Sequence, residues 1–241
     1  MDASAKRVMM PVGSFFRFEI TCAGRRPAIL LVSALIWVAA LLPLAALAER
    51  LELAPLTVPR HPGWVVKQFS GETRYTVVRE DGLTLLQAQS NATASGLVHE
   101  GRIGLAKTPW INWRWKVGNV LADVDERSKA GDDYPARVYV IAKGGLAFWQ
   151  TKALSYVWAS RQPKESGWPN AFTKNAWTIA VESGGSLTGR ILWEKRNIRE
   201  DWKHAFGEDI TVIDAVAIMT DTDNSGQSAL AWYDTPFFSF E

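Results

Sequence analysis

Acidic side chains gather in three short stretches of this 241-residue chain, and carboxylates are the groups that bind hard cations or transfer protons. The stretches are "ADVDER" (122–127), "AGDDYPAR" (130–137) and "DTDN" (221–224). From the second and third stretches we predict charged ligand-binding residues, which are Asp132, Asp133, Arg137, Asp221 and Asp223.

The third stretch belongs to the octet "MTDTDNSG", which has part of the spacing of a calcium loop. Asp221, Asp223, Ser225 and Gly226 match positions 1, 3, 5 and 6 of the EF-hand loop. Trp232 stands at position 12, where a glutamate is needed, so an EF-hand is excluded. Two alternatives stay open: a structural Ca²⁺ held by Asp221, Asp223 and Ser225 with help from elsewhere, or a tight turn closed by side-chain hydrogen bonds.

Hydrolysis of a glycan requires two carboxyl groups about 5–10 Å apart, one of them with a raised pKa. No spacing in the sequence identifies such a pair, so catalytic residues stay unassigned. Arginines lie near the acids in the sequence, and an arginine partner lowers a carboxyl pKa instead of raising it. We therefore expect an Asp–Arg network that holds the long loop 118–135 on a sheet, and we keep Glu194 and Arg196 as further ligand-binding candidates.

Tryptophan is unusually frequent, with twelve in the chain. Trp113, Trp115 and Trp177 lie in strand-like runs and are expected in the core. Trp149 and Trp168 lie in turn-rich stretches, where an exposed indole ring can stack on a sugar or an apolar ligand. The ligand-binding candidates also include Trp158 and Trp232.

Short runs rich in valine, isoleucine, tyrosine and tryptophan, separated by turn residues, predict strands. The predicted ranges are 64–69, 74–80, 83–89, 95–103, 111–118, 136–143, 153–160, 176–183, 189–198, 214–221 and 229–233. In "INWRWKV" (111–117), apolar and polar residues alternate, which is typical of a strand buried on one face. A single helix is predicted at 199–207, ending at Gly207. The fold class is therefore all-β, an antiparallel β-sandwich or jelly roll with one short helix.

Residues 1–48 have the pattern of a signal peptide behind an N-terminal extension. Arg25 and Arg26 precede an uncharged run, and Ala46, Leu47 and Ala48 fit a cleavage site before Glu49. This pattern predicts an exported protein, periplasmic or extracellular. The alternative is an uncleaved segment that anchors the protein in the inner membrane, because the run approaches the roughly 20 residues that span a bilayer.

The remaining chain, 49–241, is predicted to form a single domain. Its acidic and basic residues nearly balance, and no basic stripe points to nucleic acid. The one cysteine, Cys22, precedes the cleavage site, so the mature domain has neither a disulfide nor a thiolate metal site. The oligomeric state is not predicted.

Several stretches resemble a bacterial family catalogued as domain of unknown function 3047. They are "WRWKV" (113–117), "DERSKAGDDYPARVYV" (125–140), "LSYVWAS" (154–160), "EKRNIREDWKHAFGE" (194–208) and "MTDTDNSGQSALAWYDTPF" (219–237). The resemblance implies an exported bacterial protein and favours a β-sandwich of carbohydrate-binding-module type. The family has no assigned activity, so the resemblance implies no catalytic residues.

Three hypotheses follow for the function. The favoured one is a non-catalytic carbohydrate- or polar-polymer-binding β-sandwich in the cell envelope. The second is a glycan-acting hydrolase or lyase that uses two of the carboxylates, and the third is a structural partner in an envelope assembly. The expected partner is a glycan or another envelope component, and the only cofactor considered is the structural Ca²⁺.

Overall fold

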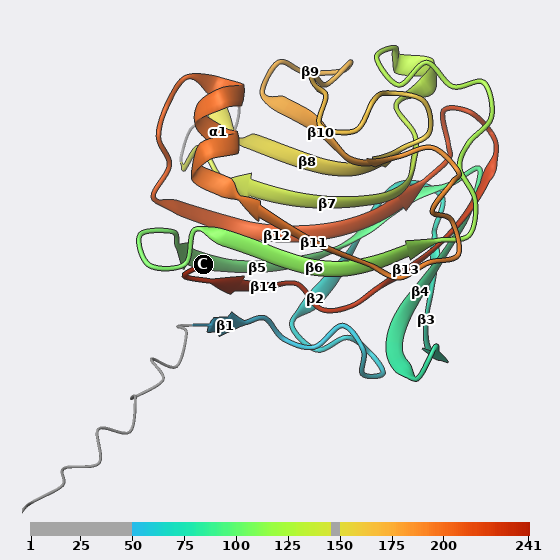
Figure 1. Ribbon diagram of the computed structural model, residues 1–241, viewed down its shortest axis with the longest axis horizontal. Coiled ribbons are helices and arrows are strands. Elements are labelled where there is room, and N and C mark those ends of the chain that lie inside the picture. Colours follow the sequence, from blue (N-terminus) through green and yellow to red (C-terminus); the bar gives the residue numbers. More distant parts are fainter. Residues whose placement is uncertain (1–49, 146–149) are drawn as a thin grey trace, which may run out of the picture. The chain divides into compact units, whose positions relative to one another are not determined.

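The structure is a computed structural model that describes residues 50–145 and 150–241, and these residues form mainly β-strands (Figure 1). The predicted signal segment, residues 1–48, lies outside the described residues. Among the described residues, no helix is both long enough and apolar enough to cross a membrane.

The strands form two sheets of seven strands each. The first sheet consists of β1 (Arg50–Glu52), β3 (Arg74–Glu80), β4 (Leu83–Asn91), β6 (Trp110–Val117), β11 (Leu192–Asn197), β13 (Ser228–Tyr233) and β14 (Phe237–Ser239). Its order is β1-β14-β6-β13-β4-β3, and β11 also pairs with β6.

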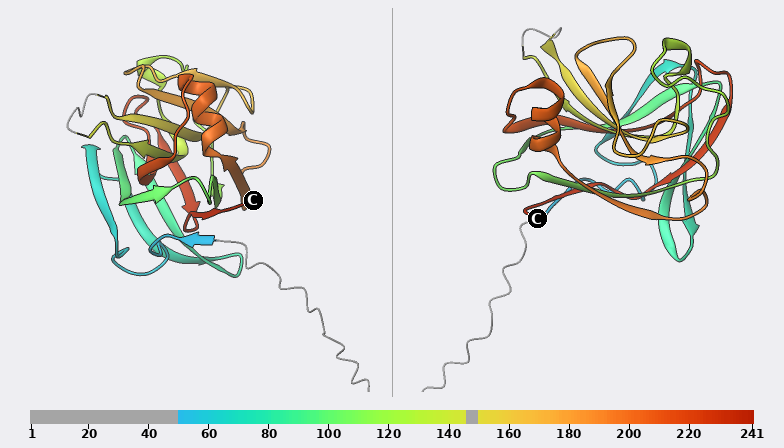
Figure 2. Two further views of the ribbon diagram at one scale, coloured as in Figure 1. Left: turned by 90° about the vertical axis from the view of Figure 1, so that its left-hand side faces the viewer. Right: turned by 45° about the horizontal axis from the view of Figure 1, so that its top comes forward.

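The second sheet has the order β2-β5-β12-β7-β8-β10-β9. Its strands are β2 (Trp64–Ser70), β5 (Ala94–Gly104), β7 (Tyr134–Ala142), β8 (Lys152–Ala159), β9 (Gly167–Pro169), β10 (Ala176–Ser183) and β12 (Val212–Asp221). Both sheets are curved, and they pack face to face as in a β-sandwich, as the two views of Figure 2 show.

Each predicted strand range corresponds to an observed strand, whereas β1, β9 and β14 were not predicted. The predicted antiparallel arrangement has one exception, because β8 and β10 pair parallel. Parallel neighbours need a long crossover connection, and residues 160–175 provide it. That connection contains β9, which pairs antiparallel with the outer side of β10.

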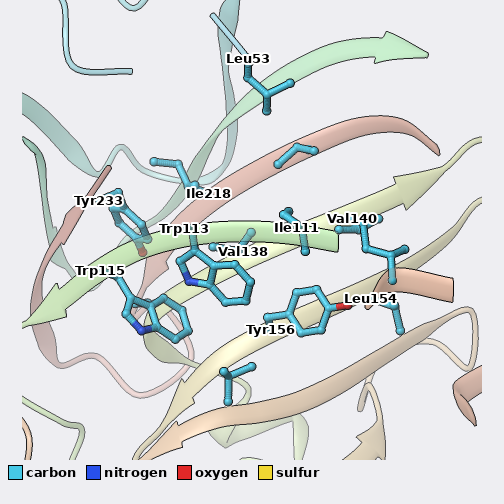
Figure 3. Packing of buried hydrophobic residues seen from close by; sticks show 14 of the residues in the cluster. Leu53, Ile111, Trp113, Trp115, Val138, Val140, Leu154, Tyr156, Ile218 and Tyr233 are labelled. Atoms are coloured by element: carbon cyan, nitrogen blue, oxygen red, sulfur yellow. The ribbon is translucent and has the colours of Figure 1, made fainter. Parts of the chain in front are cut away.

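The core between the sheets is built around large aromatic side chains (Figure 3). Trp113 of β6 stacks on Tyr156 of β8, with ring centroids 5.4 Å apart and planes at 28°. Trp115 lies beside Trp158 at 6.0 Å. All four rings are at most 1% exposed, which confirms the predicted core positions of Trp113 and Trp115. Burial of such rings is the largest favourable contribution that single side chains make to folding.

The face of β6 that was expected to be polar and solvated is largely covered. Asn112 and Lys116 are 4% and 5% exposed, and only Arg114 is half-buried. Lys116 donates to Glu80 and lies 4.4 Å from the ring of Trp232, so neighbouring strands cover this face too. The period-two pattern therefore indicated the strand but not the exposure of its second face.

The predicted helix is confirmed as α1 (Ile198–Phe206). The Asn197 side chain accepts the backbone N–H groups of Arg199 and Glu200, which caps its N-terminus. Gly207 ends the helix in the left-handed conformation, at φ 73°. Trp202 faces the sheets and is 2% exposed.

A buried glutamate anchors the long loop that precedes β7. Both oxygens of Glu126 accept backbone N–H groups, from Ser160, Arg161 and Gln162. Burial raises the pKa of Glu126, and these three hydrogen bonds limit the rise because they stabilise the ionised form. The loop is therefore fixed to the segment after β8, and this places Asp132 and Asp133 at the start of β7.

Candidate functional site

The turn after β12 is held by an aspartate from a distant part of the chain. Asp133 accepts hydrogen bonds from the Ser225 backbone N–H at 2.6 Å and from the Asn224 side-chain amide at 2.9 Å. Gly226 closes the turn with a φ of 68°, a conformation that glycine adopts without strain. The second acidic stretch therefore caps the third and brings both to one place.

Arg137 connects these carboxylates to the middle of the second sheet. Its guanidinium donates to both oxygens of Asp221, with Nε 2.7 Å from Oδ1. It also donates to the Asp132 carbonyl oxygen and to the Tyr139 hydroxyl oxygen, which is 2.9 Å away. Arg137 and Asp221 are 3% and 2% exposed, so each charge is compensated by its partner instead of by water.

Two of the carboxylates near this arginine, Asp221 and Asp223, have raised pKa values. Burial raises the pKa of Asp221 to about 7; Arg137 opposes the rise, and the charges of Asp133 and Asp132 add to it. Burial and the charge of Asp133 also raise the pKa of Asp223. Four carboxylates lie close together here, and the one arginine among them contacts only Asp132 and Asp221, so the site favours neutral or cationic groups over anions.

A pocket of about 420 Å³ opens beside this network, on the face of the second sheet that points away from the core. Its lining combines charged, amide, aromatic and thioether side chains, mainly Phe69, Asp132, Arg137, Tyr139, Asn170, Phe172, Met219, Asp221, Asp223 and Asn224. Two rings flank it and stay open to solvent, since Phe69 is 73% and Phe172 55% exposed. Exposed rings of this size are characteristic of binding surfaces.

The amide in the pocket is held in one orientation. Asn170 Nδ2 donates to Asp132 Oδ2 at 2.7 Å, and Asn170 Oδ1 accepts the Phe172 backbone N–H at 3.0 Å. Asp132 Oδ1 in turn lies 3.4 Å from Arg137. Asn170, Asp132 and Arg137 thus form one chain of hydrogen bonds whose geometry is set before any ligand arrives.

A larger depression of about 900 Å³ lies elsewhere on the domain, and we do not assign it as the site. Its lysines Lys143 and Lys152 pair with the surface acids Glu100 and Glu208. Exposed pairs of this kind are common on protein surfaces and contribute little.

The structure thus brings together six of the predicted site residues, which are Asp132, Asp133, Arg137, Asp221, Asp223 and Ser225. Asp133 and Ser225 support the pocket from behind and do not line it. As expected, Arg137 pairs with the acids of the long loop and of β12, whereas Arg196 pairs with Asp201.

The other predicted ligand-binding residues lie away from this pocket. Trp158 is buried in the core, and its Nε1 donates to the Gly184 carbonyl oxygen at 3.0 Å. Trp232 lies under Lys116 on the first sheet. Glu194 and Arg196 are on β11, also in the first sheet.

The two tryptophans expected in exposed turns do not form the aromatic rim. Trp168 is 3% exposed, so the expectation that its ring is free is wrong; its Nε1 donates to the Glu126 carbonyl oxygen, and Arg127 lies 5.6 Å from the ring. Trp149 lies outside the described residues. The rim is built from Phe69 and Phe172 instead.

Sequence reasoning missed the aromatic and amide side of the pocket, namely Phe69, Tyr139, Asn170, Phe172 and Met219. For two of these residues, the sequence did contain a signal. Asn170 and Phe172 lie in the turn-rich stretch "ESGWPNAF" (165–172), in which only the tryptophan was singled out.

Most of the carboxylate oxygens that could bind a metal ion here already accept hydrogen bonds. The oxygens that Asp133, Asp221 and Asp223 can offer lie within 4.8 Å of one another, a separation that suits a cation. However, both Asp221 oxygens are bonded to Arg137, and both Asp133 oxygens accept hydrogen bonds from the turn. Ca²⁺ takes six to eight oxygen ligands, so this arrangement favours the capped turn over the calcium site.

The fold and the pocket define a two-sheet β protein with a polar site on the outer face of one sheet. Residues 62–236 match the family described as Protein of unknown function (DUF3047), and the chain belongs to that family. No curated protein matches the chain significantly.

The solved structures that this chain resembles are distant from it in sequence. The family 11 carbohydrate-binding module of a cellulosomal cellulase of Clostridium thermocellum has a TM-score of 0.42 and 11% identity, covering 80% of this chain and 95% of that one. A lectin from Bauhinia forficata in complex with GalNAc has a TM-score of 0.39 and 9% identity, covering 80% and 100%. The xyloglucanase domain of NopAA from Sinorhizobium fredii has a TM-score of 0.39 and 8% identity, covering 72% and 92%. At this distance they carry no information on what this chain binds.

We predict that the turn after β12 is stable without calcium. Millimolar Ca²⁺ or EDTA should leave the melting temperature unchanged in calorimetry, because Arg137 already occupies the Asp221 oxygens. The variant Asp133→Ala should melt several degrees lower in both buffers, since it leaves the N–H of Ser225 without its acceptor. A rise with Ca²⁺ that disappears in Asp223→Asn would contradict this prediction.

Glu194 should make the stability depend on pH. Burial raises its pKa from 4.5 to about 7; the hydrogen bond from Trp115 Nε1 opposes the rise and the charge of Glu182 adds to it. Between those two values the folded state holds a proton that the unfolded state has released, so stability falls as pH rises from about 4.5 to 7.

The variant Glu194→Gln keeps an acceptor for Trp115 but cannot titrate. We expect its advantage over the native protein in urea unfolding to grow by up to about 3 kcal/mol between acidic and neutral pH. Glu100→Gln, at an exposed position, is the matched control and should show no such change. Parallel pH profiles for the native protein and Glu194→Gln would show that Glu194 titrates normally.

Proposed function

We propose that this domain is a non-catalytic module that binds a glycan or a similar polar polymer in the pocket on the outer face of the second sheet. The observation that carries the proposal is the meeting of two exposed rings, Phe69 and Phe172, with the fixed polar chain of Asp132, Asn170 and Arg137. Binding pockets in proteins combine apolar walls with a few well-placed polar groups in this way.

The two exposed aromatic rings suit contact with the face of a sugar ring. A pyranose presents C–H groups on its faces and hydroxyls around its edge, so a flat apolar surface can contact the face while polar groups reach the edge. Phe69 comes from the edge strand β2, and Phe172 comes from the connection between β9 and β10. The two rings therefore flank the pocket from separate segments.

The polar part suits hydroxyl groups. Carboxylate oxygens accept from hydroxyls, and an amide can donate and accept at the same time. Because Asp132 and Asn170 are already hydrogen-bonded to each other, a ligand does not have to order them. The excess of carboxylates over arginine disfavours an anionic polymer and favours a neutral or amino-bearing one.

Export of the protein belongs to the same proposal and is supported by the sequence pattern of residues 1–48 alone. We propose a cleaved signal peptide, a single mature domain from residue 49, and a location in the periplasm or outside the cell; an uncleaved inner-membrane anchor is the alternative. We also propose that the strands of the two sheets are connected as in a jelly roll.

A second candidate function is hydrolysis or cleavage of the bound glycan. Asp223 favours it, because its carboxyl has a raised pKa and faces the pocket beside Asp132. A carboxyl group that keeps its proton at higher pH can act as a general acid. Against this candidate, Asp221 is held by Arg137 in a closed ion pair and is not free to act as the second group.

The proposal is tested by measuring binding to a panel of neutral, amino-bearing and acidic polysaccharides with fluorescence or calorimetry. We expect binding to at least one neutral or amino-bearing glycan and weaker binding to acidic ones. Phe172→Ala and Asn170→Ala should each weaken it at least about fivefold, in line with the loss of a stacking contact or a hydrogen bond.

Phe240→Ala is the matched control, because Phe240 is 60% exposed but does not line the pocket. Absence of binding across the panel, or equal binding by all three variants, would contradict the proposed function. Chromatography of the same samples shows whether shorter products form; products that disappear with Asp223→Asn would establish the second candidate in its place.

A further inference from the structure

A second, apolar groove continues from the polar pocket along the same sheet face. It has a volume of about 270 Å³, and its own lining includes Gly96, Val98, Ile141, Ala153 and Ala217. Phe69, Tyr139 and Met219 line both the groove and the polar pocket. The polar pocket and the apolar groove therefore lie next to each other on the same sheet face.

The strand register shows why this part of the sheet is hollow. Tyr139 of β7 lies opposite Ala217 of β12, and Ala217 lies opposite Val98 of β5. In the next row, Met219 lies opposite Gly96, where an added Cβ would come within 2.9 Å of the Ile218 carbonyl oxygen. Small side chains on adjacent strands thus form the floor of the groove, with larger ones at its sides.

A plain glycan does not match the apolar groove. Hydroxyl groups placed there would lose water and gain few partners, because the lining consists of apolar side chains apart from Thr151 and Tyr139. Both of these hydroxyls already accept a hydrogen bond, that of Tyr139 from Arg137 and that of Thr151 from the Gly144 backbone N–H. A hydrocarbon chain matches this surface and gains free energy from leaving water.

We propose that the ligand is an amphiphile: a neutral or cationic hydroxylated head group, such as a sugar, occupies the polar pocket, and an aliphatic chain attached to it lies in the groove. The assignment of the head group rests on the proposed function, whereas the assignment of the aliphatic chain rests on the groove alone. Because Phe69, Tyr139 and Met219 line both cavities, a head group in one and a chain in the other would lie next to each other. The carboxylates Asp132, Asp221 and Asp223 disfavour a phosphate or carboxylate head.

The test uses alkyl glycosides of one sugar with methyl, butyl, hexyl and octyl chains, titrated below their micelle concentrations into the protein as recovered from expression of the full-length chain. Affinity should rise about two- to fourfold for each methylene that the groove buries. An octyl glycoside should bind more tightly than octanoate, whose head group is anionic.

Ala153→Phe fills the groove and should remove the chain-length dependence while leaving the methyl glycoside affinity unchanged. Leu51→Phe is the matched control, since Leu51 is 41% exposed on β1 of the first sheet and does not line either cavity. If Ala153→Phe does not fold, Ile141→Ser serves instead, because it makes the groove polar without filling it.

The outcomes separate the two parts of the proposal. Affinity that is independent of chain length would overturn the amphiphile and leave glycan binding intact. Octanoate that binds as tightly as the octyl glycoside would overturn the assigned head group and the proposed function with it. Chain-length dependence that persists in Ala153→Phe would place the chain elsewhere and overturn the groove assignment. A concentration-dependent dimer that Ala153→Phe abolishes would show a second copy in the groove, which also overturns it.

Discussion

The buried ion pair between Arg137 and Asp221 is the interaction on which the arrangement of the site depends. It joins neighbouring strands β7 and β12 through two parallel hydrogen bonds. Through the Asp132 carbonyl oxygen it also fixes the end of the long loop. Such a pair contributes little net stability after desolvation, but loss of one partner leaves a charge without compensation. The pair therefore acts mainly to specify one arrangement of the segments around it.

The sheets support this arrangement from the core side. The Tyr233 hydroxyl, on the first sheet, donates to the Met219 carbonyl oxygen of β12 at 2.6 Å and accepts the Arg137 backbone N–H at 3.3 Å. One side chain thus connects the first sheet to both strands that carry the ion pair. Glu126 supports the same region from the loop side. The pocket is a surface feature whose geometry is set by buried polar contacts, which explains why its polar groups are ordered without a ligand.

The sequence predicted the strands and the acidic centre better than the shape of the site. Alternation in β6 and the glycine after α1 are local signals; they predicted the strand and the end of the helix, and both were confirmed. The acids at 132–133 and 221–223 were expected together with an arginine, and the structure brings them together. The strands β1, β9 and β14 have three residues each, too few to show a period. Phe69 and Phe172 could not be predicted as the rim, because their exposure depends on β2 being an edge strand and on the path of the 160–175 connection.

Urea unfolding of Arg137→Met, Asp221→Leu and the double variant tests the central claim, that these two charges depend on each other, most directly. We predict that Arg137→Met alone lowers the free energy of unfolding by about 3–5 kcal/mol, because it leaves Asp221 buried and unpaired. The double variant should recover at least half of that loss, since it removes both charges together. If the losses of the two single variants simply add in the double variant, the two residues are not coupled and the account is contradicted.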